Sequence, residues 1–174
     1  MLRMFLCALL LFTSSPQLDY SRKVDWNLPQ DVRKRLEAAK FFDYYSLSDA
    51  VNPFYLRGDF DGDGKADYAI LVTARKDQKR FIAICRSGTK DIEIISDRDV
   101  SSVFDPKKPI STKDDLEWMD AWQITDKQTL EAGELSEGTP PAMKGEGILA
   151  EKTESASVII YWTGKRYHWY QAGD

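Results

Sequence analysis

The stretch Gly58-Asp59-Phe60-Asp61-Gly62-Asp63-Gly64-Lys65-Ala66-Asp67, followed by the apolar run Tyr68-Ala69-Ile70-Leu71-Val72, dominates this sequence. Alternating aspartates with glycines between them favour a tight loop, and the apolar run favours a strand that leaves it. Neighbouring carboxylates in such a loop lie about 5 Å apart, where each pair costs about 3 kcal/mol at an effective dielectric near 20. A Ca²⁺ ion, which takes roughly six to eight oxygen ligands, reverses that cost. We therefore interpret residues 59–67 as a calcium loop.

The spacing of the acids matches the ligand positions of known calcium loops. Gly64 stands at position six, where the backbone bends sharply around the ion, and position seven supplies a main-chain carbonyl. An EF-hand would carry Glu at position twelve, but Ile70 is there, so a strand replaces the exiting helix. The alternative is a solvated Asp-Gly turn that holds no metal. The expected calcium ligands are Asp59, Asp61, Asp63, Lys65 through its carbonyl, and Asp67 directly or through water.

This strand-loop-strand motif resembles the calcium loops of FG-GAP and VCBS repeats over about Leu56 to Cys85. In that family the loops join strands of β-propeller blades and are commonly extracellular. A propeller needs several blades, and this chain has one copy. The resemblance therefore implies a related loop on a smaller domain. The whole chain also looks like a type of small exported bacterial protein without an assigned activity.

Outside the loop, the pattern predicts an N-terminal helix followed by strands. Leu28, Val32, Leu36 and Ala39 fall on one helical face, and a further helical turn is expected at Ser46 to Val51. The region Gly133 to Gly147 reads as a long surface loop, and Leu116 to Ile124 weakly favours a strand. Other strands are expected at Phe54–Asp59, Asp67–Ala74, Phe81–Arg86, Asp91–Ser96, Ile148–Glu151, Ser157–Trp162 and Arg166–Gln171.

These elements predict an α+β fold, in which the N-terminal helix or helices pack on an antiparallel β-sheet meander. The chain of 174 residues suits one domain, expected over residues 16–174. Residues 1–15 resemble a signal peptide, because Arg3 precedes an apolar run that is too short to span a bilayer. We therefore expect a periplasmic or secreted protein that is not bound to the membrane once this segment is removed.

Charge and cysteine content exclude several classes of function. A net charge of −4 and a pI near 5.1 argue against nucleic acid and against an anionic membrane surface. Removal of residues 1–15 would leave Cys85 alone, so no internal disulfide is possible, and an inert buried thiol is expected. The single histidine, His168, excludes a zinc site built on several histidines.

Two aromatic regions leave alternatives open. Glu117 and Asp120 flank Trp118, and a pair of carboxylates facing a sugar could hydrolyse it. In the C-terminal hairpin, Trp162 and nearby rings such as Tyr167 and Trp169 could form a stacking platform for sugar or peptide, but we favour a core packed against the N-terminal helix.

The sequence thus predicts an exported, calcium-binding domain of the cell envelope with a binding or structural role and no enzymatic activity. We expect a monomer whose partner is an envelope protein or a carbohydrate. The alternative function is a carbohydrate-active hydrolase that uses acids such as Glu117 and Asp120.

Overall fold

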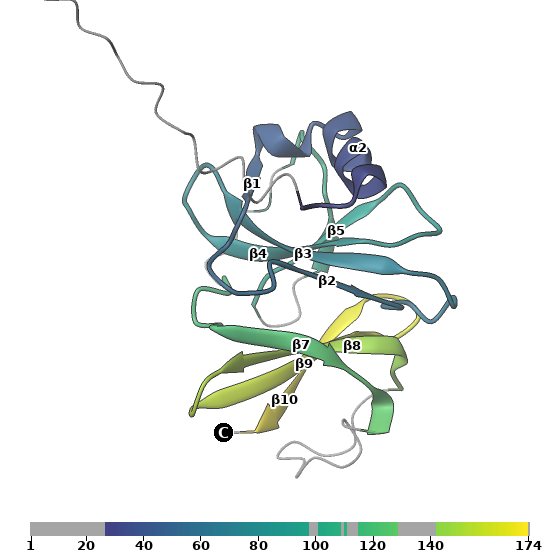
Figure 1. The fold of residues 1–174 in the computed structure, drawn as a ribbon, viewed down its shortest axis with the longest axis vertical. Coiled ribbons are helices and arrows are strands. Elements are labelled where there is room, and N and C mark those ends of the chain that lie inside the picture. The colour runs from purple at the N-terminus through teal and green to yellow at the C-terminus, as the bar shows by residue number, and fades with distance from the viewer. Residues whose placement is uncertain (1–26, 98–100, 109, 111–114, 129–141, 174) are drawn as a thin grey trace, which may run out of the picture.

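The computed structural model describes residues 27–97, 101–108, 110, 115–128 and 142–173. Of these residues, 44% lie in strands and 11% are helical. They form two antiparallel sheets and one α-helix (Figure 1). The predicted α+β class is therefore wrong, because a second sheet supplies much of the core. The predicted signal peptide, residues 1–15, lies outside the described residues.

The elements fall into two groups along the chain. The first group is helix α2 (Gln30–Ala38), the 3₁₀ turn η1 (Phe41–Asp43), and strands β1 (Tyr45–Leu47), β2 (Tyr55–Gly58), β3 (Asp67–Ala74), β4 (Arg80–Cys85), β5 (Ile92–Ile95) and β6 (Ser101–Val103). The second group is β7 (Ala121–Thr125), β8 (Lys144–Lys152), β9 (Ala156–Trp162) and β10 (Tyr167–Gly173).

The first sheet runs β1-β3-β4-β5-β6, and β2 also pairs with β3. Strands β1 and β2 share one edge of β3, because Tyr45 pairs with Ala74 at one end and Gly58 pairs with Asp67 at the other. The second sheet runs β10-β9-β8-β7. This register brings the two ends of the acidic loop together where β2 ends and β3 begins.

Several local predictions need correction. Strand β1 lies where the helical turn at Ser46 to Val51 was expected to begin, and β6 was not predicted. The predicted strand at Leu116 to Ile124 starts only at Ala121. Residues from Lys144 onward, assigned to a surface loop, belong to β8. By contrast, β2 to β5 and the β9–β10 hairpin lie within a residue or two of their predicted positions.

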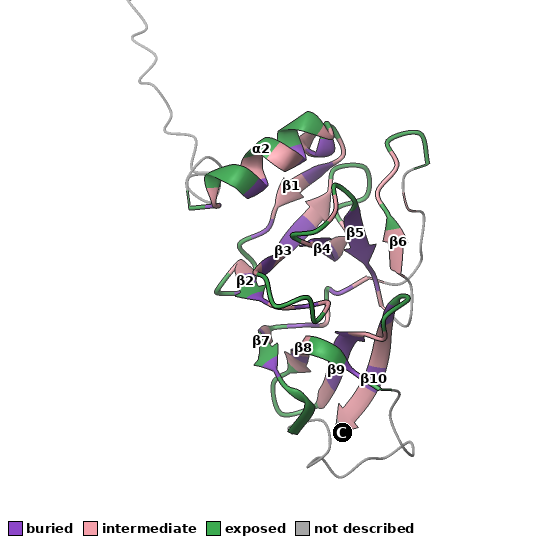
Figure 2. Ribbon diagram, turned by 90° about the vertical axis from the view of Figure 1, so that its right-hand side faces the viewer, coloured by how far each residue is buried: buried purple, intermediate pink, exposed green. Residues whose placement is uncertain are grey.

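Both faces of the first sheet are buried. Ile70 and Val72 lie in a cluster with Leu36 of helix α2, whereas Leu71 lies in a cluster with Ile148 of the second sheet. Figure 1 shows the resulting layers, with α2 on one side of the first sheet and the second sheet on the other. In Figure 2, α2 carries buried residues on one side and exposed residues on the other. One short helix covers only one face, so a run that is apolar at every position requires the second sheet.

Three of the C-terminal aromatic residues, Trp162, Tyr167 and Trp169, belong to the core between the sheets, whereas Tyr161 and Tyr170 lie in a separate cluster with Met143 and Ile159. Tyr167 is 2% exposed, and Trp162 and Trp169 pack against the same cluster. Trp162 and Tyr167 are tilted by 56°, with ring centroids 5.0 Å apart, so these two rings do not form a flat stacking platform. Burial agrees with the favoured prediction, but its partner was wrong, since helix α2 packs on the opposite face of the first sheet.

The layered arrangement predicts that substitutions on either face of β3 are costly. Leu71→Ala, facing the second sheet, and Ile70→Ala, facing the helix, should each lower the free energy of unfolding by about 2 to 5 kcal/mol. Urea denaturation measures both values. Val103→Ala, at a position that is 50% exposed, should change the free energy by less than about 0.5 kcal/mol. A negligible cost for either β3 variant would contradict the burial of both faces.

Candidate metal site

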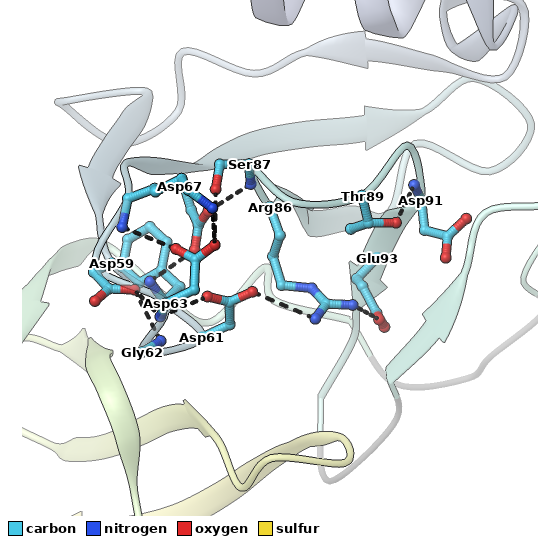
Figure 3. A network of polar contacts seen from close by, with 12 residues as sticks. Asp59, Asp61, Gly62, Asp63, Asp67, Arg86, Ser87, Thr89, Asp91 and Glu93 are labelled. Carbon is cyan, nitrogen blue, oxygen red and sulfur yellow. Dashed lines mark hydrogen bonds and ion pairs between the residues drawn. The ribbon is translucent and has the colours of Figure 1, made fainter.

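Three aspartates of the loop between β2 and β3 converge. One carboxylate oxygen from each of Asp59, Asp61 and Asp67 lies within 4.8 Å of the others, and Figure 3 shows the group beside the end of β4. The convergence follows from the β2–β3 register, which places Asp67 opposite Gly58 and therefore next to the start of the loop. Oxygen donors at this separation can hold a metal ion.

Asp59 organises the turn. Its Oδ1 accepts hydrogen bonds from the backbone N–H groups of Gly62 (2.8 Å) and Asp63 (3.1 Å). Its Oδ2 accepts one from the N–H of Gly64 (3.0 Å). Gly62 and Gly64 have φ values of 80° and 79°, in the left-handed region that glycine adopts without a steric penalty. The carboxylate and the two glycines together wrap the chain around the group.

Asp67 is fully buried at the start of β3. Its Oδ2 accepts a hydrogen bond from the N–H of Phe60 (2.9 Å), and its Oδ1 accepts one from the N–H of Ser87 (2.7 Å). Burial raises the pKa of this carboxyl to about 6, and Asp61 and Asp63 add to the rise, against the effect of the hydrogen bonds. A nearby cation would offset the cost of keeping this buried group ionised.

Asp63 lies outside the converging group. Its Oδ1 accepts a hydrogen bond from the N–H of Lys65 (2.8 Å), and its Oδ2 is 3.1 Å from Lys65 Nζ and 3.3 Å from Ser87 Oγ. The backbone and side-chain hydrogen bonds from Lys65 lower the pKa of Asp63. The structure thus brings together three of the four predicted carboxylates. The Lys65 side chain is 66% exposed, and it neutralises the fourth.

The second sheet contributes to the site in a way the sequence did not reveal. The N–H of Asp59 donates to Glu146 Oε2 (2.7 Å), and the N–H of Glu146 donates to the Asp59 carbonyl (2.6 Å). Gly145, with a φ of 68°, lies in an irregular part of β8 where the pairing with β9 shifts between Lys144 and Ile148. The loop therefore rests on the backbone of the other sheet.

Arg86, directly after β4, was also missed. Its Nη1 is 3.6 Å from Asp61 Oδ2, and its Nη2 is 3.2 Å from Glu93 Oε1 (Figure 3). Its guanidinium carbon lies 4.4 Å from the ring centroid of Trp162 in β9. The contacts with Asp61 and Trp162 join segments distant in sequence, so no local pattern pointed to them. For the contact of Glu146 with the loop, the sequence did contain a hint. The glycines of Gly145-Glu146-Gly147 could have indicated a close backbone approach.

No family model, curated protein or solved structure matches this chain. The function therefore rests on the site itself. Among the described residues, no helix has the length and apolar character needed to cross a membrane.

The surroundings of Cys85, His168 and Asp120 do not favour a catalytic role for these residues. Cys85 is buried, and burial raises the pKa of its thiol to about 11, which leaves it protonated and inert. The His168 ring lies edge-on to Tyr161, with centroids 5.7 Å apart. Hydrogen bonds from Lys152 and Thr153 lower the pKa of Asp120 to about 2. An acid that is ionised at neutral pH cannot protonate a glycosidic oxygen, so Asp120 does not fit the general-acid role.

Gly145 should be sensitive to substitution because of its contact with the loop. A Cβ atom there would collide with the Asp59 carbonyl and with the backbone nitrogen of Gly62. Gly164 also has a positive φ, 93°, but among the described residues a Cβ there meets only Lys144 Cγ, at 3.9 Å. Gly164→Ala should therefore cost about 1 kcal/mol, and Gly145→Ala should cost at least about 2 kcal/mol. Equal unfolding free energies in urea would contradict this contact.

Asp67 should make stability depend on pH. In chelator, the pKa of Asp67 is about 6 in the folded protein and about 4 in the unfolded chain. The folded state holds the proton more tightly, so stability from this group is complete below about pH 4 and is lost as the pH rises through about 6.

The comparison with Asp67→Asn isolates this effect, because the other acids titrate in both proteins. The unfolding free energy of the wild type minus that of the variant should fall by about 2 to 3 kcal/mol between about pH 4 and pH 7. Urea denaturation in chelator at several pH values measures the difference. A difference that does not vary with pH would show that the pKa of Asp67 is not raised.

Proposed function

We propose that the loop 59–67 binds Ca²⁺, and that the protein is an exported domain of the cell envelope with a non-enzymatic binding or structural role. The observation that carries this proposal is the convergence of Asp59, Asp61 and Asp67 within 4.8 Å, with Asp67 fully buried. A buried carboxylate beside two others is costly unless a cation compensates for it.

The chemistry of the donors favours calcium over other metals. The converging ligands are carboxylate oxygens, which suit hard cations, whereas zinc prefers histidine and cysteine. Magnesium demands a near-octahedral shell and keeps most of its waters, whereas calcium accepts the irregular, larger shells that loops provide. Gly64, with a φ of 79°, lies at the position where calcium loops require a sharp bend. The resemblance to FG-GAP and VCBS loops agrees with this choice.

The buried hydroxyl of Tyr167 is a second observation in favour of a ligand at the loop 59–67. The residue is 2% exposed, and its hydroxyl has no hydrogen-bond partner among the described residues. Burial raises the pKa of this hydroxyl well above its usual value, and the charge of Asp67 adds to the rise whereas that of Arg86 opposes it. A buried, unpartnered hydroxyl calls for an explanation, and a water molecule of the ion's hydration shell would provide one.

The proposed role of the ion is to stabilise the connection between the sheets. The loop joins β2 to β3 in the first sheet and is hydrogen-bonded to Glu146 of the second. Calcium activates water weakly compared with zinc, which favours a structural role over catalysis. In this proposal the protein is a periplasmic or secreted monomer, and its partner is an envelope protein or a carbohydrate.

Calcium should stabilise the protein. Extracellular calcium modules bind with dissociation constants of about 10⁻⁴ to 10⁻³ M. At about 10 mM calcium, such affinities add about 1.4 to 2.7 kcal/mol to the free energy of unfolding. The melting temperature should then rise by roughly 3 to 10 °C relative to protein in chelator. Differential scanning fluorimetry of the whole chain measures the shift.

Asp→Asn substitutions, which preserve side-chain size, test whether the calcium-induced rise in melting temperature depends on the loop. Asp61→Asn combined with Asp63→Asn should abolish it, whereas Asn at the exposed position Asp49 should leave it unchanged. Magnesium at the same concentration should give a smaller rise. Equal melting temperatures of the wild type in calcium and in chelator would refute calcium binding.

A further inference from the structure

We propose that Arg86 is an internal counter-cation that competes with the bound calcium ion for Asp61 and thereby weakens calcium binding. The proposal rests on the proposed function and adds to it a residue that sets the affinity of the site. It starts from the position of Arg86 between Asp61 of the loop and Glu93 of β5 (Figure 3).

Residues 86 and 87 form the wall of the loop on the side of β4. The Ser87 N–H donates to Asp67, and the Ser87 hydroxyl donates to Asp63. The Arg86 guanidinium faces Asp61. Two consecutive residues thus contact three of the four aspartates, and one of these two residues carries a full positive charge.

The two ion pairs of Arg86 differ in strength. Nη2 is hydrogen-bonded to Glu93 Oε1 at 3.2 Å, and Ser101 Oγ donates to the other Glu93 oxygen at 2.9 Å. Nη1 is 3.6 Å from Asp61 Oδ2, which is too long for a hydrogen bond. Glu93 therefore anchors the guanidinium, whereas Arg86 attracts Asp61 by charge alone. Asp61 Oδ1 also accepts a hydrogen bond from the Asp63 N–H (3.2 Å). Asp61 can turn toward an ion without breaking a hydrogen bond to Arg86.

The charge of Arg86 should oppose a divalent ion at this place. The Arg86 and Asp61 side chains are only 16% and 13% exposed, so water and salt screen their charges poorly. A positive charge beside a ligand both attracts the carboxylate away from the ion and repels the ion itself. Both effects lower the affinity, and both disappear when the charge is removed.

A purely structural role for Arg86 predicts the opposite result. If the arginine only holds the loop and Glu93 in place, its removal disorders the ligands and weakens calcium binding. If it competes with calcium, its removal strengthens binding, although the protein without calcium becomes less stable through repulsion among the acids. The sign of the change in affinity therefore separates the two roles.

The experiment is calcium titration calorimetry on the whole chain at constant ionic strength, with melting curves in chelator. Arg86→Met, which keeps the aliphatic stem, should bind calcium about tenfold more tightly and melt at a lower temperature in chelator. Arg86→Gln, a second neutral variant, should also bind more tightly. Arg86→Lys keeps the charge and should bind within about threefold of the wild type.

Arg80, the first residue of β4, provides a matched control on the strand that precedes Arg86. Its Nη1 donates to the Met119 carbonyl at 2.7 Å. Arg80→Met should lower stability in chelator and leave calcium affinity unchanged. Trp162 supplies a spectroscopic signal, since the Arg86 charge lies over its ring. Calcium should change the tryptophan fluorescence of the wild type, and this change should be reduced in Arg86→Met and in Trp162→Phe.

Each outcome decides the question. Unchanged or weaker calcium binding in the neutral Arg86 variants, with a wild type that binds, overturns the counter-cation role and leaves the calcium site intact. A wild type that binds no calcium overturns both proposals. Tighter binding in Arg80→Met as well would assign the effect to general loss of stability and overturn the specific role of Arg86.

Discussion

The burial of the Asp67 carboxylate at the start of β3 is the constraint on which the rest of the structure depends. The group is removed from water, and its two oxygens are held by N–H groups from two different segments, the loop at Phe60 and the end of β4 at Ser87. These bonds fix where the loop begins and ends. When the carboxyl is ionised, they leave a negative charge in a poorly solvated place, which is costly unless it is compensated.

The remaining acids are balanced by different means. Backbone N–H groups satisfy Asp59, whereas Lys65 faces Asp63 and Arg86 faces Asp61. The arrangement departs from the simple expectation that four aspartates converge on one point, because Asp63 prefers its neighbouring lysine. The chain's own cations thus compensate two of the four aspartates, Asp63 and Asp61.

The sequence predicted the acidic loop, its flanking strands and most of the hairpins, because these features depend on neighbours in the chain. Asp59, Gly64 and Asp67 are related by local spacing, and β3 is marked by its apolar run. The second sheet, the irregular pairing of β8 near Gly145 and the contact of Arg86 with Trp162 depend on segments that meet only after folding. The continuous apolar character of β3 and β4 did contain a clue, since a strand with one covered face alternates polar and apolar residues. Reading both faces as buried would have required a second layer opposite the helix.

The division of the β3 edge between two short strands has a further consequence for how the protein behaves among its neighbours. Strands β1 and β2 offer three and four residues on this side of the first sheet, and β6 offers three on the other side. Long, flat edges are templates on which other chains add strands and begin to aggregate. Because the segment between β1 and β2 interrupts this edge, an incoming chain finds no long row of free backbone groups there with which to pair. The first sheet is thereby protected from edge-to-edge assembly.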